Sequence, residues 1–314
     1  MFSSTSPASG VRRRTVQCAW VGVATLFLAG ALLPGSTQAR DAKREGEVRT
    51  GAAPRRAAMA FAVVASPTQA AALELIDEPM GLAWTASEVA QAGAGDATRV
   101  ISKAADADGG ECRTHCEAIA RVWLRLAAVI RAQQEGQAHP FVLSLHVVQS
   151  DDIDAFSVPD GALVLSEDFV RRRQLDDAQL AFVLAHEASH VLLEHERQTL
   201  TAALSLLPRN VSRTVDDIYV EFGFNISIFR LLEPVMHQAE YEADELGLQL
   251  AALAGYEPVE QLRFMESEAA AGEPHAAVVS THPTAKSRLA RLQTRLPLAE
   301  RIFEYGVRQR KTTR

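Results

Sequence analysis

The segment 180–196, LAFVLAHEASHVLLEHE, constrains this chain more than any other part of it. Its apolar residues recur with the spacing of a helix rather than that of a strand. Asp176 and Gln179, just ahead of it, have the spacing of a capping box. His186 and His190 are four residues apart, so their imidazoles lie one above the other on a helix. The segment therefore predicts a helix with two histidines on one face.

His186, Glu187 and His190 form the pattern H-E-x-x-H, in which two imidazoles can hold one metal ion beside a glutamate. A solvated, charged helix face and a pair of core histidines are the two alternatives. The flanking residues are among the most apolar in the chain. A buried His-Glu-His cluster needs compensation, which a metal ion supplies. We therefore predict a metal site with Glu187 as the general base.

A zinc site for hydrolysis uses three protein ligands and keeps one position open. The third ligand is expected on a second helix, which Pro234 opens and Gly255 closes. Glu240 and Asp244 are four residues apart and share a face of this helix, so the pair can supply both a ligand and a carboxylate that orients a ligating histidine. His237 shares the face of Glu240 and remains an alternative ligand.

Several neighbouring residues are predicted to lie outside the site. On a continuous helix His195 is rotated half a turn from His186, which indicates an exposed or capping histidine. Glu242 and Glu245 point elsewhere on the second helix and are expected to be solvated. Gly247 is small enough to let another helix approach closely.

The pairing of H-E-A-S-H at 186–190 with E-Y-E-A-D at 240–244 resembles the peptidase family of HtpX and the CAAX-prenyl endopeptidases. DAFSVPDGALVLSEDFV at 154–170 resembles the N-A-F-x-x-P-G-G strand of that family, and STHPTAKSRLARL at 280–292 resembles its S-T-H-P segment. The order and spacing agree over residues 115–295. Within the family the chain is most similar to the extracytoplasmic bacterial branch of BepA and LoiP.

The resemblance implies one Zn²⁺ per chain, held by His186, His190 and Glu240. It also implies that His282, in S-T-H-P, is a fourth ligand that gates the site; the alternative is a cap of the final helix. A third implication is a strand that pairs with an extended substrate. The residues of that strand are Gly161, Ala162, Leu163, Val164 and Leu165.

The predicted fold is α+β and zincin-like, mostly helical, with a small sheet beside the zinc-binding helices. A helix over 115–134, a strand over 141–149 and a strand over 162–165 precede those helices. Asp154 and Asp160 replace an Asn and a Gly of the family pattern, and both suit a turn. The segment 200–233 is either a helix packed on the core or a lid over the cleft.

The N-terminus predicts the compartment. Arginines at 12–14 precede an apolar stretch, and small residues lead to Ala39, which is typical of a cleaved signal peptide over 1–39. An uncleaved membrane anchor is the alternative. Residues 40–70 are expected to form a loosely ordered leader and 71–314 one metallopeptidase domain. The predicted location is periplasmic or otherwise extracytoplasmic.

Charge and cysteines add two expectations. Residues 1–39 hold three arginines and no acidic residue, so their removal takes the formal charge from −7 to about −10. Such an acidic chain disfavours nucleic acid as a partner. Cys112 and Cys116 remain in the mature chain, and an oxidising compartment favours a disulfide between them. They lack the two further ligands that a zinc role requires.

These features predict an extracytoplasmic zinc endopeptidase that hydrolyses unfolded or misassembled envelope proteins. Peripheral-membrane or outer-membrane assembly partners are candidate partners. The alternative is a chaperone or assembly factor whose peptidase activity is minor or gated by His282.

Overall fold

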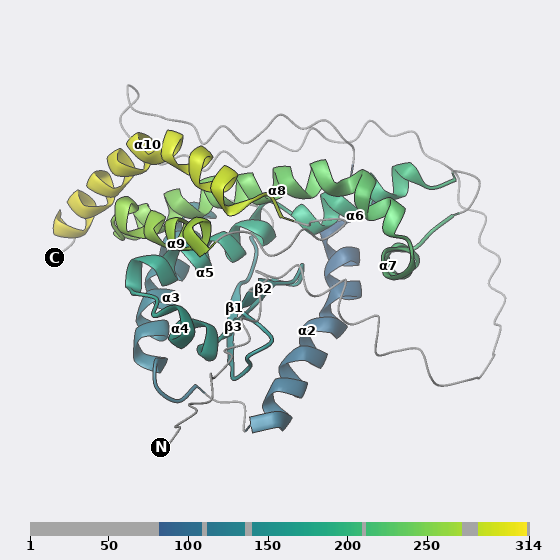
Figure 1. Ribbon diagram of the computed structural model, residues 1–314, viewed down its shortest axis with the longest axis horizontal. Helices are drawn as coiled ribbons and strands as arrows, with labels where there is room; N and C mark the ends of the chain where they lie inside the picture. The colour runs from purple at the N-terminus through teal and green to yellow at the C-terminus, as the bar shows by residue number, and fades with distance from the viewer. Residues whose placement is uncertain (1–81, 109–111, 136–139, 209–211, 272–281, 313–314) are drawn as a thin grey trace, which may run out of the picture.

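The computed structural model describes residues 82–108, 112–135, 140–208, 212–271 and 282–312. The predicted signal peptide and leader lie outside the described residues. The helices and strands, drawn in Figure 1, are α2 (Ala86–Asp108), α3 (Cys116–Gln133), β1 (Ser144–Val148), β2 (Ala155–Ser157), β3 (Ala162–Ser166), α4 (Glu167–Arg173), α5 (Asp177–Leu192), α6 (His195–Leu206), α7 (Val215–Phe224), α8 (Ile226–Leu253), α9 (Pro258–Ala271) and α10 (Ala285–Thr312). The predicted α+β class, mostly helical with a small sheet, is confirmed.

The sheet has three strands in the order β1-β3-β2, with β1 parallel and β2 antiparallel to β3. All five residues of β3 are buried. β3 is therefore the central strand, and both of its sides are already paired. The prediction that the strand over 161–165 takes up a substrate is wrong for this reason, since an added strand needs an unpaired edge.

The two faces of β3 pack against different helices, because successive side chains of a strand point to opposite faces. Leu163 and Leu165 belong to the main core with α5 and α3, whereas Val164 packs with Phe156 in a smaller cluster. Contacts place α2 against β1 and β3. Figure 1 accordingly shows the sheet between α2 and the group of α3, α4 and α5.

The turn between β2 and β3 survives the replacement of glycine by Asp160. The Asp160 Oδ1 accepts a hydrogen bond from the Ala162 N–H at 2.9 Å. Gly161 has a φ of +96°, and a Cβ there would lie 2.3 Å from the Val142 carbonyl oxygen. Glycine is thus required at position 161, while position 160 accepts an aspartate.

Helices α5 and α8 form the centre of the main core. The predicted capping box of Asp176 and Gln179 is present at the start of α5. A Cβ on Gly247 would lie 2.8 Å from the His186 backbone nitrogen, so α8 approaches α5 as closely as expected. The prediction that Pro234 opens this helix is wrong: α8 begins at Ile226 and continues through the proline. Gly255, at φ +87°, follows its end as predicted.

The segment 200–233 contributes to α6, α7 and the start of α8. Its apolar side chains pack with Val89 of α2 in a second core cluster, which includes Ile218, Phe222 and Leu232. The segment therefore corresponds to the first of the two alternatives, helical structure packed on the core. Among the described residues, no helix has both the length and the apolar character that a bilayer crossing requires.

Candidate metal centre

Helices α5 and α8 bring the three predicted ligands together. The Nε2 atoms of His186 and His190 are 3.1 Å apart. The Glu240 carboxylate lies 3.7 Å from the first, through Oε2, and 3.4 Å from the second, through Oε1. The alternative ligand His237 instead has its Nε2 3.8 Å from a Glu233 oxygen, outside this group. Glu240 is thus the carboxylate that packing places beside the two histidines.

The Glu240 side chain tests whether the site suits a metal ion. It is 1% exposed, and within the described residues neither carboxylate oxygen receives a hydrogen bond of acceptable geometry. A buried carboxylate whose oxygens lack hydrogen bonds of good geometry costs free energy, which a bound cation recovers. Bonds of 2.0–2.1 Å to a tetrahedral Zn²⁺ separate the ligand atoms by about 3.3 Å. Two imidazoles and one carboxylate at this spacing fit such an ion.

Charged neighbours keep Glu240 ionised. Burial acts to raise its pKa, but His282 and Arg288 outweigh burial and hold the pKa well below its usual range. The Arg288 Nη1 lies 3.1 Å from the Glu240 Oε2, and the His282 Nδ1 lies 3.0 Å from the same oxygen. The carboxylate is therefore available as an anionic ligand.

Glu187 lies on the same turn of α5 as the histidines and is 7% exposed. The Ser157 hydroxyl, on β2, donates a hydrogen bond to its Oε2 at 3.1 Å. Burial raises the pKa of Glu187 to about 7, with His190 acting to lower it and Glu240 to raise it. A carboxyl whose pKa lies near neutrality is suited to accept and release a proton.

Asp244 lies one turn after Glu240 and contacts the outer nitrogen of His186. Its Oδ1 is 3.0 Å from the His186 Nδ1, as expected of an orienting carboxylate. Burial acts to raise the Asp244 pKa, but Arg288 outweighs burial and lowers it. Arg288 donates through Nε and Nη2 to both Asp244 oxygens, at 2.8 and 2.6 Å.

Sequence reasoning missed Arg288. It belongs to α10, 44 residues after Asp244, and shares that helix with Arg291 and Arg295. The one feature of the sequence that could have indicated a role for Arg288 is its position in the segment that follows S-T-H-P. Nothing in the local pattern distinguishes it from the two arginines that pair with Glu245 instead.

His282 lies just before α10 and is placed against the ligand carboxylate. It is not part of the group of three ligand atoms that lie within 4.8 Å of one another. Its side chain is 20% exposed, compared with 1% for Glu240. The gating role of His282 therefore stays a prediction.

The prediction that His195 is exposed is wrong, because α5 does not continue to it. α5 ends at Leu192, and Glu194 adopts a left-handed φ of +54°. His195 then opens α6 with its side chain 1% exposed and its Nδ1 3.0 Å from the His190 Nδ1. Burial lowers the pKa of His195 to about 4, so the ring is neutral near pH 7.

The two glutamates expected to be solvated are also largely buried, and both are paired. The Glu242 Oε2 is 3.3 Å from the His195 Nε2. The Glu245 Oε2 is 2.9 Å from the Arg295 Nε. Their side chains are 18% and 16% exposed. Helix α10 and the start of α6 cover the faces of α8 that the sequence alone suggested were open.

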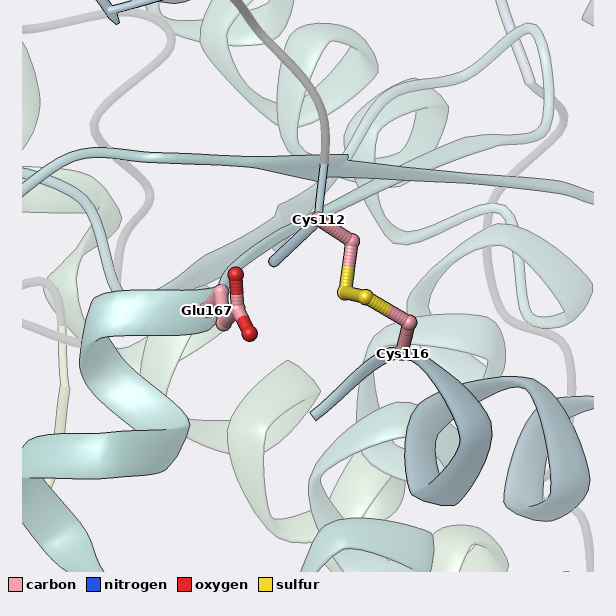
Figure 2. Close-up of side chains that lie close together, drawn as sticks. All are labelled: Cys112, Cys116 and Glu167. Atoms are coloured by element: carbon pink, nitrogen blue, oxygen red, sulfur yellow. A yellow bond between two sulfur atoms is a disulfide. The ribbon is translucent and has the colours of Figure 1, made fainter. Parts of the chain in front are cut away.

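Cys112 and Cys116 are joined by the expected disulfide, with their Cα atoms 5.5 Å apart. Figure 2 shows the carboxylate of Glu167, the first residue of α4, beside this bond. That carboxylate accepts hydrogen bonds from the backbone N–H groups of Arg113 and Thr114 at 2.7 and 2.6 Å. The disulfide and the carboxylate together fasten the start of α3.

Comparison with known proteins agrees with this geometry. The model of Peptidase family M48 matches residues 114–296. Mitochondrial metalloendopeptidase OMA1 of Schizosaccharomyces pombe is 31% identical over 161 residues, which are 50% of this chain and 47% of that protein. The OMA1 protein of Bos taurus is 30% identical over 185 residues, 51% of this chain and 34% of that protein.

A bacterial relative is more distant. The beta-barrel assembly-enhancing protease of Escherichia coli K12 is 26% identical over 163 residues, 48% of this chain and 33% of that protein. The matched part of the chain thus spans between a third and a half of each of these relatives. The family match covers the whole centre, from Ser157 to Arg288, and more than half of the chain. The predicted family is confirmed, and the chain belongs to Peptidase family M48.

Proposed function

We propose that this protein is a zinc-dependent endopeptidase. The observation that carries the proposal is the buried Glu240 carboxylate, which faces two imidazoles without a hydrogen bond of good geometry and has Glu187 beside it. The names of the relatives, metalloendopeptidase and protease, support the same reaction class.

In the proposed reaction, each residue of the metal centre has a separate role. A bound zinc ion supplies Lewis acidity, which polarises a carbonyl group and lowers the pKa of water. Glu187 accepts the proton of the attacking water and delivers it to the leaving amine. Ser157 fixes one oxygen of Glu187 through its hydroxyl. Asp244 accepts a hydrogen bond from the His186 Nδ1–H, which leaves the Nε2 lone pair for the ion.

The sheet suggests where an extended substrate binds. β2 is the edge strand on the side of the centre, since Ser157 contacts Glu187 and β2 packs against α5. We propose that the substrate adds to β2 rather than to β3. Such pairing recognises the peptide backbone, which suits unfolded polypeptides of varied sequence.

The physiological setting is proposed from the sequence and the relatives. The N-terminal pattern predicts an extracytoplasmic, periplasmic protein. The name of the Escherichia coli relative refers to β-barrel assembly. We therefore propose unfolded or misassembled envelope proteins as substrates, and outer-membrane assembly components as partners.

A second candidate function is a chaperone with a gated peptidase centre. The observation that favours it is the 3.0 Å contact between the His282 Nδ1 and the Glu240 Oε2. In this proposal His282 would be a fourth ligand of the bound ion. Hydrolysis would then be suppressed until a substrate displaced the histidine.

The test is cleavage of casein by the zinc-loaded protein, with Glu187→Gln, His282→Ala and the control Glu260→Gln beside the wild type. Glu260 is a surface residue of α9 paired with Arg263. We expect Glu187→Gln to keep zinc and lose cleavage, because it removes a base and not a ligand. A gain with His282→Ala would support gating. No cleavage by the wild type or by His282→Ala, both with full zinc, would contradict the endopeptidase and favour the chaperone.

A further inference from the structure

His190 makes a contact on the side of its ring that faces away from Glu240. Its Nε2 points toward the ligand group, whereas its Nδ1 lies 3.0 Å from the Nδ1 of His195. The two rings meet edge to face, with an interplanar angle of 77°. His195 is thus placed where metal-binding histidines commonly meet a hydrogen-bond acceptor.

The protons of these rings can be assigned from their partners. A His190 that offers the Nε2 lone pair to a metal ion carries its hydrogen on Nδ1. The Nδ1 of His195 must then accept that hydrogen, which leaves the His195 hydrogen on Nε2. The Glu242 Oε2 lies 3.3 Å from this Nε2 and accepts from it. The other oxygen of Glu242 accepts from the Gln238 Nε2 at 2.9 Å.

We propose that His195 and Glu242 are positioning residues that hold His190 in the metal-binding tautomer and orientation. The hydrogen bonds run in one direction, from His190 to His195 to Glu242, and each atom has a single consistent role. The inference rests on the proposed metal site but not on the reaction that occurs there.

The backbone is shaped to make this contact. Glu194 is one of two non-glycine residues with positive φ among the described residues. Such a conformation costs free energy and persists where the surroundings require it. Arg197 pairs with the Glu194 carboxylate and also donates to the Trp84 carbonyl, which ties the bend to the start of α2. The bend is what returns His195 toward His190.

The two ligand histidines are oriented by different means. His186 has Asp244 directly at its Nδ1, and both oxygens of that carboxylate are held by Arg288. His190 reaches its carboxylate through a second imidazole. Glu242, at the end of this path, is 18% exposed and lines a cavity of about 270 Å³ between α6 and α8. The orienting carboxylate of His190 is therefore the one nearer to solvent.

The test compares four variants of the full chain by their affinity for Zn²⁺, measured by competition with a chelator. His195→Phe keeps a ring in the buried position and removes both hydrogen bonds. His195→Asn retains an acceptor close to the Nδ1 position. Glu242→Gln removes the charge of the last residue. Glu245→Gln is the matched control, because Glu245 is a similarly buried glutamate of α8 that pairs with arginines instead.

We expect His195→Phe to weaken zinc binding about 10- to 100-fold, the usual cost of losing an outer partner of a ligand. His195→Asn should recover part of that loss. Glu242→Gln should weaken binding several-fold but by less than about 10-fold, because an amide oxygen still accepts the bond from His195, without the charge of the carboxylate. Glu245→Gln should bind like the wild type.

Nuclear magnetic resonance of histidine-labelled, zinc-loaded protein provides a second readout. The His190 Nδ1–H should be protected from exchange in the wild type and in Glu245→Gln, and unprotected in His195→Phe. A purely structural role for His195 would change the melting temperature of the zinc-free protein without moving this signal.

Unchanged zinc affinity in His195→Phe would overturn the proposal. If His195→Phe does not fold, the zinc affinities of His195→Asn and Glu242→Gln test the proposal instead. Wild-type affinity in both variants would overturn the proposal. A wild type that binds zinc but cleaves nothing would contradict the proposed function and leave the positioning role of His195 and Glu242 intact. A wild type that binds no zinc would refute both.

Discussion

Among the described residues, two groups bring three metal-ligating side chains within 4.8 Å of one another, one around Glu240 and one around Glu167. Both glutamates are buried, at 1% and 2% exposure. The Glu240 oxygens receive no hydrogen bond of good geometry, whereas Glu167 accepts from the backbone N–H groups of residues 113–115 and from the Gln149 side chain. Ligating residues that lie together therefore do not by themselves make a metal site; the group around Glu240 also has two imidazoles beside carboxylate oxygens that, within the described residues, lack hydrogen bonds of good geometry.

The cluster around Glu167 has a structural explanation instead. Burial acts to raise the Glu167 pKa, but the hydrogen bonds from Arg113, His115 and Thr114 outweigh burial and hold it well below its usual range. These N–H groups directly precede α3, and the last of them belongs to His115, the N-cap residue of that helix. The two sulfur atoms are bonded to each other. Within this group, the carboxylate oxygens accept hydrogen bonds and the sulfur atoms form a disulfide, so neither is available to a metal ion.

The largest difference between the clusters should appear in metal content. We expect Glu240→Ala to weaken zinc binding by more than about 100-fold, since it removes a ligand rather than an outer partner. Glu167→Ala should keep one zinc per chain. Elemental analysis after gel filtration measures both. Full zinc in Glu240→Ala would break the comparison and return His237 to consideration as the third ligand.

Asp244 tests how far the centre depends on its outer carboxylate. Asp244→Ala should weaken zinc binding about 10- to 100-fold, because the His186 ring loses the acceptor at its Nδ1. Chelator competition measures the change. Wild-type affinity in this variant would show that Arg288 and packing alone orient His186.

Glu167 should matter for stability and not for zinc. Glu167→Ala leaves three backbone N–H groups without their acceptor and should lower the free energy of unfolding by about 3 kcal/mol at pH 7. Because the folded-state pKa is depressed, the wild-type advantage is present above the unfolded-state pKa of about 4.3 and is lost as the pH falls below it. Urea unfolding at pH 7 and pH 3 measures both. An equal difference at the two pH values would contradict this account.

Asp154 is a third buried carboxylate, and in the described part of the chain only one of its two oxygens accepts a hydrogen bond. Its Oδ1 accepts from Arg172 at 2.8 Å, while within the described residues its Oδ2 has no hydrogen-bond partner. Burial raises its pKa to about 6, against the opposing effect of Arg172. A raised folded-state pKa means stability that is present below about pH 4 and lost as the pH rises through about 6.

Asparagine, which has a similar shape but does not ionise, removes that loss of stability. Asp154→Asn should therefore be more stable than the wild type by about 1–2 kcal/mol at pH 8, and the advantage should shrink toward pH 4. Melting temperatures across this range measure it. A variant that is less stable than the wild type at pH 8 would show that the Arg172 ion pair outweighs burial.

The sequence was sufficient for much of the centre because the relevant spacings are local. His186 and His190 are one helical turn apart, as are Glu240 and Asp244, and the apolar pattern places each pair on a helix. Cys112 and Cys116 are four residues apart, so the chain between them keeps the two sulfurs within reach. Each of these arrangements depends on the geometry of a single short segment.

Other features depend on contacts between distant segments. His195 was misplaced because one left-handed residue, Glu194, ends the helix that its apolar pattern appeared to continue. The resemblance implied that the strand over 161–165 pairs with a substrate, but β2, a strand of only three residues, already pairs with that side of β3. Arg288 reaches the centre from α10, and its neighbours in sequence are arginines with other partners.

The sequence by itself determined the helix faces, the ligand types and the family, because helical periodicity and motif spacing are properties of neighbouring residues. Tertiary structure decided which buried carboxylate of the described residues lacks hydrogen bonds of good geometry, which strand has an unpaired edge and which ring lies behind His190. The physical reason is that hydrogen-bond satisfaction is a property of the whole environment of an atom. Residues such as Glu240 and Glu167 differ in the donors that folding brings to them.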